Sequence, residues 1–190
     1  MPNITIGIPS HNGSGKIQKC LRSIFTVDDT LDKLAPRLLV IDDGSTPEEL
    51  ERTITVTNQY QIPLLINPQR FGVSKSWNLL TRHYDSEYIV LLNNDIEVTA
   101  YWLYALLFSL EYNPQLGVIG FNAFEGPNRY QKPLVPTYYE AKLLHGSKSA
   151  PLLACRGYAF GFSKQNFDLV GGFDERYYYF FEEVDFNSLK

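Results

Sequence analysis

Hydrophobic residues along the chain fall into short blocks with two different spacings. Continuous apolar runs of about four to eight residues are typical of buried strands, and apolar residues three or four apart are typical of helices. Strands and helices that alternate in this way favour an α/β fold, with a mostly parallel sheet and helices on both faces. The pattern predicts strands at residues 4–9, 37–42, 62–67, 88–92, 116–123 and 154–163, and helices at 17–25, from 47, at 73–84 and at 99–112.

Polar residues follow each of the first four predicted strands. Ligands of open α/β sheets bind beyond the carboxyl ends of the strands, where such residues gather at one edge. The sequence therefore predicts a single site at this edge. The segments are Ser10-His11-Asn12-Gly13, Asp42-Asp43-Gly44-Ser45, Asn67-Pro68-Gln69-Arg70 and Asn93-Asn94-Asp95.

Two adjacent carboxylates, Asp42 and Asp43, end the second predicted strand. Their charges repel, so at least one of them is expected to have a partner. A carboxylate accepts hydrogen bonds, so either could bind the N–H groups of a pyrimidine base or the hydroxyls of a ribose. The alternative is a plain turn, in which an Asp caps the chain that follows and Gly44 has a positive φ.

The segment Asn93-Asn94-Asp95-Ile96-Glu97 follows a buried strand. If the extended geometry continues, residues 93, 95 and 97 share one side of the chain. Oxygen ligands in this arrangement suit a hard divalent cation, which also binds substrate phosphates. A polar turn before the next helix is the alternative.

A third acidic group contains Glu182, Glu183 and Asp185 and follows the aromatic run 177–181. Apolar rings disfavour the charged form of a carboxylate, which makes it a better base near neutral pH. An acidic first turn of a helix is the alternative. Upstream, residues 124–151 are rich in Pro, Gly and Tyr and show no period, so we expect a mobile loop that shapes an acceptor site.

The composition narrows the classes of partner and location. The formal net charge is -4, so the chain lacks the basic surplus that nucleic-acid binding needs. Its two cysteines are too few for a disulfide framework, and we expect reduced thiols in a cytoplasmic protein. The apolar helical block at 101–110 has about half the length that crosses a bilayer. Peripheral membrane association stays open.

The stretch Gly13-Ser14-Gly15-Lys16 resembles a phosphate-binding P-loop, because it lies between a predicted strand and a predicted helix. A P-loop also requires glycine at position 10 and serine or threonine at position 17. The chain has Ser10 and Ile17 at these positions, so a P-loop nucleotide hydrolase is not expected.

Five segments, taken in order, resemble the family-2 glycosyltransferases, which have the GT-A fold. Each motif is weak alone, but their order and spacing match over almost the whole chain, and the NND-type motif is similar to that of rhamnosyltransferase-like enzymes. The resemblance implies one Rossmann-like GT-A catalytic domain over residues 1–190. The segments are 8–13 (IPSHNG), 40–45 (VIDDGS), 67–78 with Asn67, Gly72 and Asn78, 91–98 (LLNNDIEV) and 171–186 (GGFDERYYYFFEEVDF).

The resemblance implies a donor site for a nucleotide sugar with a divalent metal, Mn²⁺ or Mg²⁺. Asp95 matches the last acid of the family's DxD motif and would hold the metal on the diphosphate. The motif begins with Asn93 rather than Asp, so metal binding would depend mostly on Asp95. The other implied donor-site residues are Pro9, Asn12, Asp42 and Asp43 at the nucleoside, with one acid on the base, and Gly72, Asn78, Asn93 and Asn94 near the nucleotide.

The resemblance also implies the catalytic group. Glu183 falls where the family has the Asp of its Glu-Asp motif, which is the general base, and Asp185 matches the next acid of that motif. Glutamate is one methylene longer than aspartate, so Glu182 or Asp185 could serve instead. The family continues past this motif with further helix, so we expect a chain that is truncated at its C-terminus.

The implied reaction is inverting transfer of a sugar to a hydroxyl of a saccharide or glycoconjugate acceptor, in polysaccharide or glycoconjugate synthesis. A sugar-phosphate nucleotidyltransferase is one alternative, but it needs a Gly-rich loop with an Arg after the first strand, and residues 10–16 contain no Arg. A non-catalytic domain that binds carbohydrate or nucleotide sugar is the other.

Overall fold

The computed structural model describes residues 2–27, 29–112, 117–123, 134–136, 157–178 and 185–186. Its elements alternate along the chain as the hydrophobic pattern predicts. The strands are β1 (Ile4–Ser10), β2 (Arg37–Asp43), β3 (Leu64–Asn67), β4 (Tyr88–Leu92), β5 (Val118–Ala123), β6 (Leu134–Pro136) and β7 (Ala159–Ser163). The helices are α1 (Ser14–Thr26), α2 (Thr30–Leu34), α3 (Pro47–Gln59), α4 (Val73–His83), α5 (Trp102–Tyr112) and α7 (Lys164–Val170).

The strands form one seven-stranded sheet in the order β3-β2-β1-β4-β7-β5-β6. β3, β2, β1 and β4 are parallel neighbours. β7 pairs antiparallel with both β4 and β5, and β6 pairs antiparallel with β5. β5 therefore runs in the direction of the first four strands, and the prediction of a mostly parallel sheet is confirmed.

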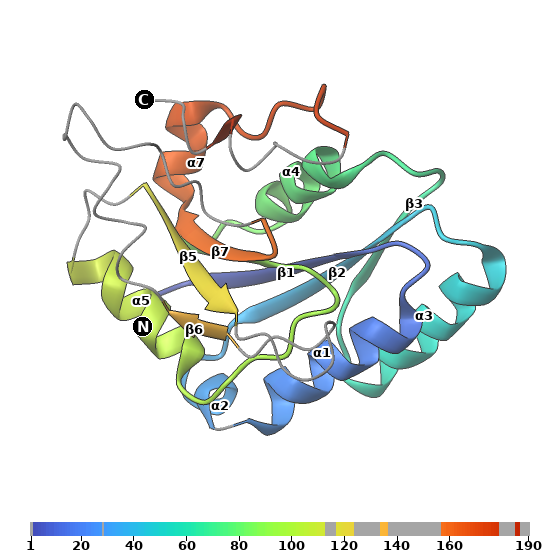
Figure 1. Cartoon of the computed structure of the whole chain (residues 1–190), viewed down its shortest axis with the longest axis horizontal. Coiled ribbons are helices and arrows are strands. Elements are labelled where there is room, and N and C mark those ends of the chain that lie inside the picture. Colours follow the sequence, from blue (N-terminus) through green and yellow to red (C-terminus); the bar gives the residue numbers. More distant parts are fainter. Residues whose placement is uncertain are drawn as a thin grey trace.

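Helices cover both faces of the sheet, as predicted, and Figure 1 shows α4 and α7 on one side and α1 and α3 on the other. One buried cluster joins β1 and β4 to α1 and α5, and the other joins β2, β4 and β7 to α4 and α7. Burying one Ile, Leu or Phe side chain stabilises the fold by about 1.5–3 kcal/mol, so these two clusters are what hold the helices on the sheet.

Alternation along β2 decides which way its last residues point. Val40 belongs to the cluster under α1, whereas Leu39 and Ile41 belong to the cluster under α4. Successive side chains of a strand point to opposite faces. Asp42 and Asp43 at the end of β2 therefore point to opposite faces of the sheet, which relieves the repulsion expected between neighbouring carboxylates.

Aromatic rings hold the C-terminal part of the chain against the α4 face. Trp77 of α4 contacts Phe160 and Phe173, each with ring centroids 5.0 Å apart. Phe186 stacks on Phe173 at 4.3 Å and is 3% exposed. The buried Phe186 places the end of the acidic segment beside α4 and α7.

The boundaries depart from the hydrophobic pattern in a few places. The last predicted helix begins at Trp102 rather than Thr99, because Tyr101 has a φ of 61° that a right-handed helix does not accept. The short helix α2 and the strand β6 were not predicted. Most of the loop predicted at 124–151 lies outside the described residues, as does Cys155. Among the helices described, none combines the length and the apolar character needed to cross a bilayer.

Candidate functional site

The four parallel strands end at one edge of the sheet, and β1 separates from β4 just before that edge. The β1–β4 pairing runs from Ile4 to Gly7 and stops there, whereas the β1–β2 pairing continues to Ser10. Pro9 lies beyond the last β4 partner, so its missing N–H costs no hydrogen bond to β4. The gap that opens past Gly7 leaves room for side chains between the ends of β1 and β4.

Hydrogen bonds tie the loop after β1 to the loop after β2. Asn12 has a φ of 47°, a conformation that asparagine tolerates better than most residues. Its backbone N donates to Ser45 Oγ at 2.8 Å, and its Oδ1 accepts from Thr46 N at 2.9 Å. His11 Nδ1 lies 2.9 Å from the backbone O of Asp43. Asn12 thus stands at the rim of the predicted nucleoside pocket, exposed but fixed by both loops.

Asp43 holds the loop between β3 and α4. Its Oδ1 accepts from Asn67 Nδ2 at 2.8 Å and Phe71 N at 2.9 Å, and its Oδ2 accepts from Gly72 N at 2.9 Å. The side chain is 5% exposed, and a buried carboxylate is stable only when donors replace its lost water. The pairing of Asn67 with Asp43 was not predicted, although an Asn at the end of a neighbouring parallel strand is the signal that could have suggested it.

Asp42 is fully buried on the opposite face. Its Oδ1 accepts from Ser45 N at 2.9 Å, and Gly44 between them has a φ of 70°. The turn that was the alternative interpretation of this motif is therefore present. Asp42 Oδ2 is buried without a hydrogen-bond partner, which leaves one strong acceptor at the strand end unused by the protein.

The chain turns immediately after β4. Ile96 N donates to Asn93 O at 3.3 Å, so extended geometry ends at Leu92 and residues 93, 95 and 97 do not form one row of a strand. The prediction that residues 93, 95 and 97 share one side of the chain is therefore wrong, because the polar residues after Leu92 form a tight turn instead of a longer strand. Asp95 is on the turn itself, where its side chain is 37% exposed.

The start of α1 packs directly against this turn. Asn94 Nδ2 donates to Ser10 Oγ at 2.9 Å across the gap between β1 and β4. A Cβ at Gly13 would lie 2.3 Å from Asn94 Nδ2, so a larger residue at this position would displace the Asn94 amide. One helical turn further, Lys16 Nζ lies 3.6 Å from Asp95 Oδ2. The structure thus brings together the ends of β1, β2, β3 and β4, as the sequence predicts.

The chemistry of the turn fits a hard divalent cation to a limited extent. Asp95 offers an accessible carboxylate, and such cations take carboxylates together with substrate phosphates. No cluster of three His, Cys, Asp or Glu side chains occurs within the described ranges. Cys20 beneath the turn is fully buried, and burial, followed by the charges of Asp95 and Glu97, raises the pKa of its thiol. Its full burial makes Cys20 a packing residue rather than a reactive thiol.

Gly72 and Asn78, predicted near the nucleotide, support the segment that leads to the acidic motif. A Cβ at Gly72 would lie 2.6 Å from Tyr178 O, and Val73 N donates to the same oxygen at 3.1 Å. Asn78 is 2% exposed. Its Nδ2 donates to Phe173 O and Glu175 Oε1, and its Oδ1 accepts from Phe173 N. Asn78 therefore has no free amide group to offer a ligand.

The acidic motif is only partly described. Glu183, the predicted base, and its neighbour Glu182 lie outside the described residues. Asp185 is helical and half-buried next to Phe186. Hydrogen bonds and charge from Asp174 raise the pKa of Arg176, and the charge of Asp185 adds a smaller effect in the same direction.

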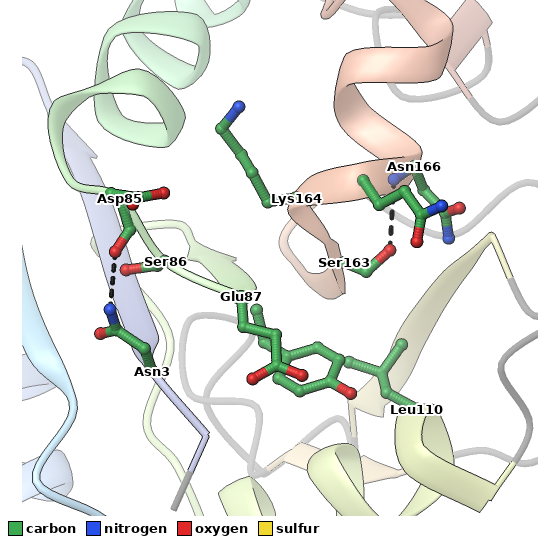
Figure 2. A pocket seen from close by; sticks show the side chains of 10 residues that line it. Asn3, Asp85, Ser86, Glu87, Leu110, Ser163, Lys164 and Asn166 are labelled. Atoms are coloured by element: carbon green, nitrogen blue, oxygen red, sulfur yellow. Dashed lines mark hydrogen bonds between the residues drawn. The ribbon is translucent and has the colours of Figure 1, made fainter.

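A separate hollow of about 530 Å³ lies at the other edge of the sheet, and Figure 2 shows its lining. Asn3, Asp85 and Ser86 border it at the start of β1 and before β4, and Ser163 and Lys164 border it at the end of β7. Lys164 forms an ion pair with Asp168 rather than pointing at the hollow's acids. Because the amino ends of the parallel strands meet here, the hollow is remote from the edge where α/β sheets bind ligands.

The chain belongs to glycosyltransferase family 2. The model of that family, described as glycosyl transferase family 2, matches residues 5–170. This match decides against a sugar-phosphate nucleotidyltransferase. No curated protein sequence matches the chain.

Solved glycosyltransferases have the same GT-A fold. The mannosyltransferase PcManGT from Pyrobaculum calidifontis, in complex with GDP-Man and Mn²⁺, superposes with a TM-score of 0.64 at 18% identity over 92% of this chain. TarS residues 1–349 from S. aureus superposes with a TM-score of 0.67 at 16% identity over 97% of this chain. GalNAc-T7 with UDP, GalNAc and Mn²⁺ superposes with a TM-score of 0.71 at 16% identity over 98% of this chain. The chain spans 48%, 54% and 40% of the lengths of these three chains.

Proposed function

We propose that the protein transfers a sugar from a nucleoside-diphosphate donor to a hydroxyl of a saccharide or glycoconjugate, with inversion at the anomeric carbon. The proposal rests on one observation, which is that hydrogen bonds join the strand-end motifs at one edge of the sheet. These bonds are Asn94 to Ser10 and Asn67 to Asp43. In a family-2 glycosyltransferase domain, this edge is where a ligand of the sheet belongs.

The donor would lie across the ends of β1, β2 and β4. Pro9, Asn12, Asp42 and Asp43 would form its nucleoside end. Asp42 Oδ2, which has no partner in the protein, would be the acceptor for an N–H or hydroxyl donor. Asn93 and Asn94 would lie beside the diphosphate. Gly72 and Asn78 would act by holding the loop and the 173–178 segment that border the nucleotide.

Asp95 would be the protein's carboxylate ligand for a divalent cation. When bound, Mn²⁺ or Mg²⁺ would neutralise charge on the diphosphate leaving group. PcManGT and GalNAc-T7 are both described in complex with Mn²⁺ and a sugar or nucleotide ligand, which supports this assignment by family. The exposure of Asp95 at the rim leaves its oxygens accessible.

The acidic motif would supply the general base. Glu183 would take the proton from the acceptor hydroxyl, with Glu182 and Asp185 as the alternatives. Direct attack by that oxygen on the anomeric carbon, opposite the departing diphosphate, inverts the centre. Polysaccharide or glycoconjugate synthesis, rhamnosyltransferase-like specificity, a cytoplasmic location and peripheral membrane association stay predictions.

A thermal-shift screen tests the proposal. UDP-, GDP- and dTDP-sugars, each with Mn²⁺ or Mg²⁺, should include at least one that raises the melting temperature, because a ligand that binds only the folded state stabilises it. Metal alone and nucleoside monophosphates are the controls. A binding donor should then lose its sugar to an acceptor or to water. If no nucleotide sugar stabilises the chain, the proposal fails; if one binds without any turnover, the non-catalytic alternative replaces it.

A further inference from the structure

Lys16 is a cation at the candidate site that the proposed function has not used. Its Nζ lies 3.6 Å from Asp95 Oδ2, with the two side chains 56% and 37% exposed. Lys16 belongs to the stretch at 13–16 that resembles a P-loop but fails its requirements at positions 10 and 17. Its place beside Asp95 therefore needs an explanation of its own.

The contact results from how the helix start is fixed. Gly13 approaches Asn94 so closely that a Cβ would displace the Asn94 amide, and Ser14 N donates to Glu49 Oε2 at 3.0 Å. Lys16 follows within the first turn of α1. The backbone of Lys16 is thus held next to the turn that carries Asp95, while its exposed side chain is able to swing within reach of that turn.

The net charge around Asp95 differs from that of a DxD motif with two aspartates. The chain has Asn93 in place of the leading acid, and Lys16 brings a positive charge. The formal charges of Lys16 and Asp95 sum to zero, whereas two aspartates would sum to -2. A divalent cation is attracted less strongly to such a pair, and a diphosphate is repelled less. A lysine ammonium is also a strong donor to phosphate oxygens.

We propose that Lys16 is a donor-binding residue with two partners: it pairs with Asp95 when the site is free and turns to the diphosphate oxygens when the donor binds. Lys16 then carries part of the charge neutralisation that a divalent cation would otherwise supply alone. The inference deepens the proposed function and rests on it. It predicts opposite effects of Lys16 on metal binding and on diphosphate binding.

The first measurement is the affinity for Mn²⁺ alone, by electron paramagnetic resonance titration. Lys16→Met frees Asp95 and should tighten Mn²⁺ binding about two- to fivefold, the range expected for loss of one exposed ion pair. Lys16→Arg keeps the charge and should behave like the wild type. Lys33→Met is the matched control, because Lys33 of α2 pairs with Asp29 at 2.7 Å, away from the carboxyl ends of the strands.

The second measurement is the binding of inorganic pyrophosphate in EDTA, by ³¹P NMR titration. The wild type should bind it, Lys16→Met should bind about tenfold more weakly, as for loss of one charged hydrogen bond, and Lys16→Arg should retain most of the affinity. Unchanged Mn²⁺ affinity in Lys16→Met, or pyrophosphate binding that is absent or insensitive to Lys16, overturns the inference. The proposed function fails by a different result, namely no stabilisation of the wild type by any nucleotide sugar with metal.

Discussion

Asn78 and Phe173 are joined by two hydrogen bonds although they are 95 residues apart in the chain. Asn78 Nδ2 donates to Phe173 O at 2.9 Å, and Asn78 Oδ1 accepts from Phe173 N at 2.9 Å. A side chain on α4 thereby satisfies both backbone groups of a residue in the segment that leads to the acidic motif. This pair couples the loop after β3, held by Asp43, to the part of the chain expected to carry the base.

Replacing Asn78 with Ala should destabilise the fold by about 2–4 kcal/mol, because the buried N–H and C=O of Phe173 lose their partners. Urea unfolding measures the change. Asn58→Ala is the control: Asn58 is exposed on α3, so its effect should stay within about 0.5 kcal/mol. Equal stability of the two variants would mean that the Phe173 segment does not depend on Asn78.

Asp43→Asn should lower the free energy of unfolding by about 1–3 kcal/mol. The substitution keeps the size of the side chain but replaces one acceptor oxygen with an NH₂ group, which leaves a buried N–H such as that of Gly72 without its acceptor. Chemical denaturation is again the measurement. Asp168→Asn removes a charge from an exposed ion pair and should change stability much less.

The fold was largely predictable because burial leaves a periodic pattern. The strand at 88–92 and the start of α3 at Pro47 match the structure, since an apolar run and a first-turn proline are local signals. The direction of β7 was not predictable, because a strand buried on both faces has the same apolar pattern in either direction. The late start of α5 depends on the backbone conformation of Tyr101, which the pattern does not encode.

The edge that carries the site was predictable, but its contacts were not. The rule that parallel strands end together is topological, so it follows from the order of the elements. The Asp43–Asn67 pair joins two strand ends, and the Lys16–Asp95 pair depends on the path of the loop after β1. The turn at Asn94 likewise replaced an expected strand. Loop paths are set by contacts between distant residues, which a periodic pattern does not contain.

Asp95→Asn should abolish metal-dependent donor binding while stability changes by no more than about 0.5 kcal/mol, because the side chain lies at the exposed rim. We expect the affinity for a nucleotide with Mn²⁺ to fall by about 100-fold or more, since even residues that only support metal ligands are worth about 10–100-fold. Isothermal titration calorimetry with Mn²⁺ and the stabilising nucleotide measures it. Asp29→Asn removes an exposed acid at the N-cap of α2 and should leave this affinity unchanged. Retained affinity in Asp95→Asn would remove Asp95 from the metal site.

Glu183→Gln should lower turnover by about 10² to 10⁴, the usual contribution of a positioned base, with little change in donor affinity. Initial rates of transfer at saturating donor and acceptor, measured in the longest form of the protein available, give the comparison. Loss of turnover in Asp185→Asn but not in Glu183→Gln would assign the base to Asp185. If neither variant lost turnover, the acids would have only a structural role at a helix start.

Acid should destabilise the start of α1, because Ser14 N donates a hydrogen bond to the Glu49 carboxylate there. Hydrogen bonds from Ser14, with a smaller effect of Arg52, hold the pKa of this carboxyl below its ordinary value of 4.5. A lowered folded-state pKa adds stability above the unfolded pKa, and this stability is lost as the pH falls through the folded value. Glu49→Gln should therefore be less stable than the wild type at pH 7, and the difference should shrink as the pH drops below about 4.5.

Thermal unfolding from pH 7 to pH 3 measures this difference. Glu48→Gln is the matched control in the same first turn of α3, because Glu48 is exposed and its charge change is identical. A pH-independent gap between Glu49→Gln and the wild type would show that the carboxylate does not stabilise α1 through its charge.

The position of β7 in the sheet constrains the order in which the molecule assembles. β7 lies between β4 and β5, although it follows both in the chain. During synthesis, β1 to β4 emerge first and pair through crossover connections of about 20–26 residues. β5 must wait about 35 residues for the strand that joins it to the rest, and closing a longer loop before contacts form is slower. A chain that ends after α5 therefore has a row of unpaired backbone groups on β4, an edge that can pair with another strand until β7 is made.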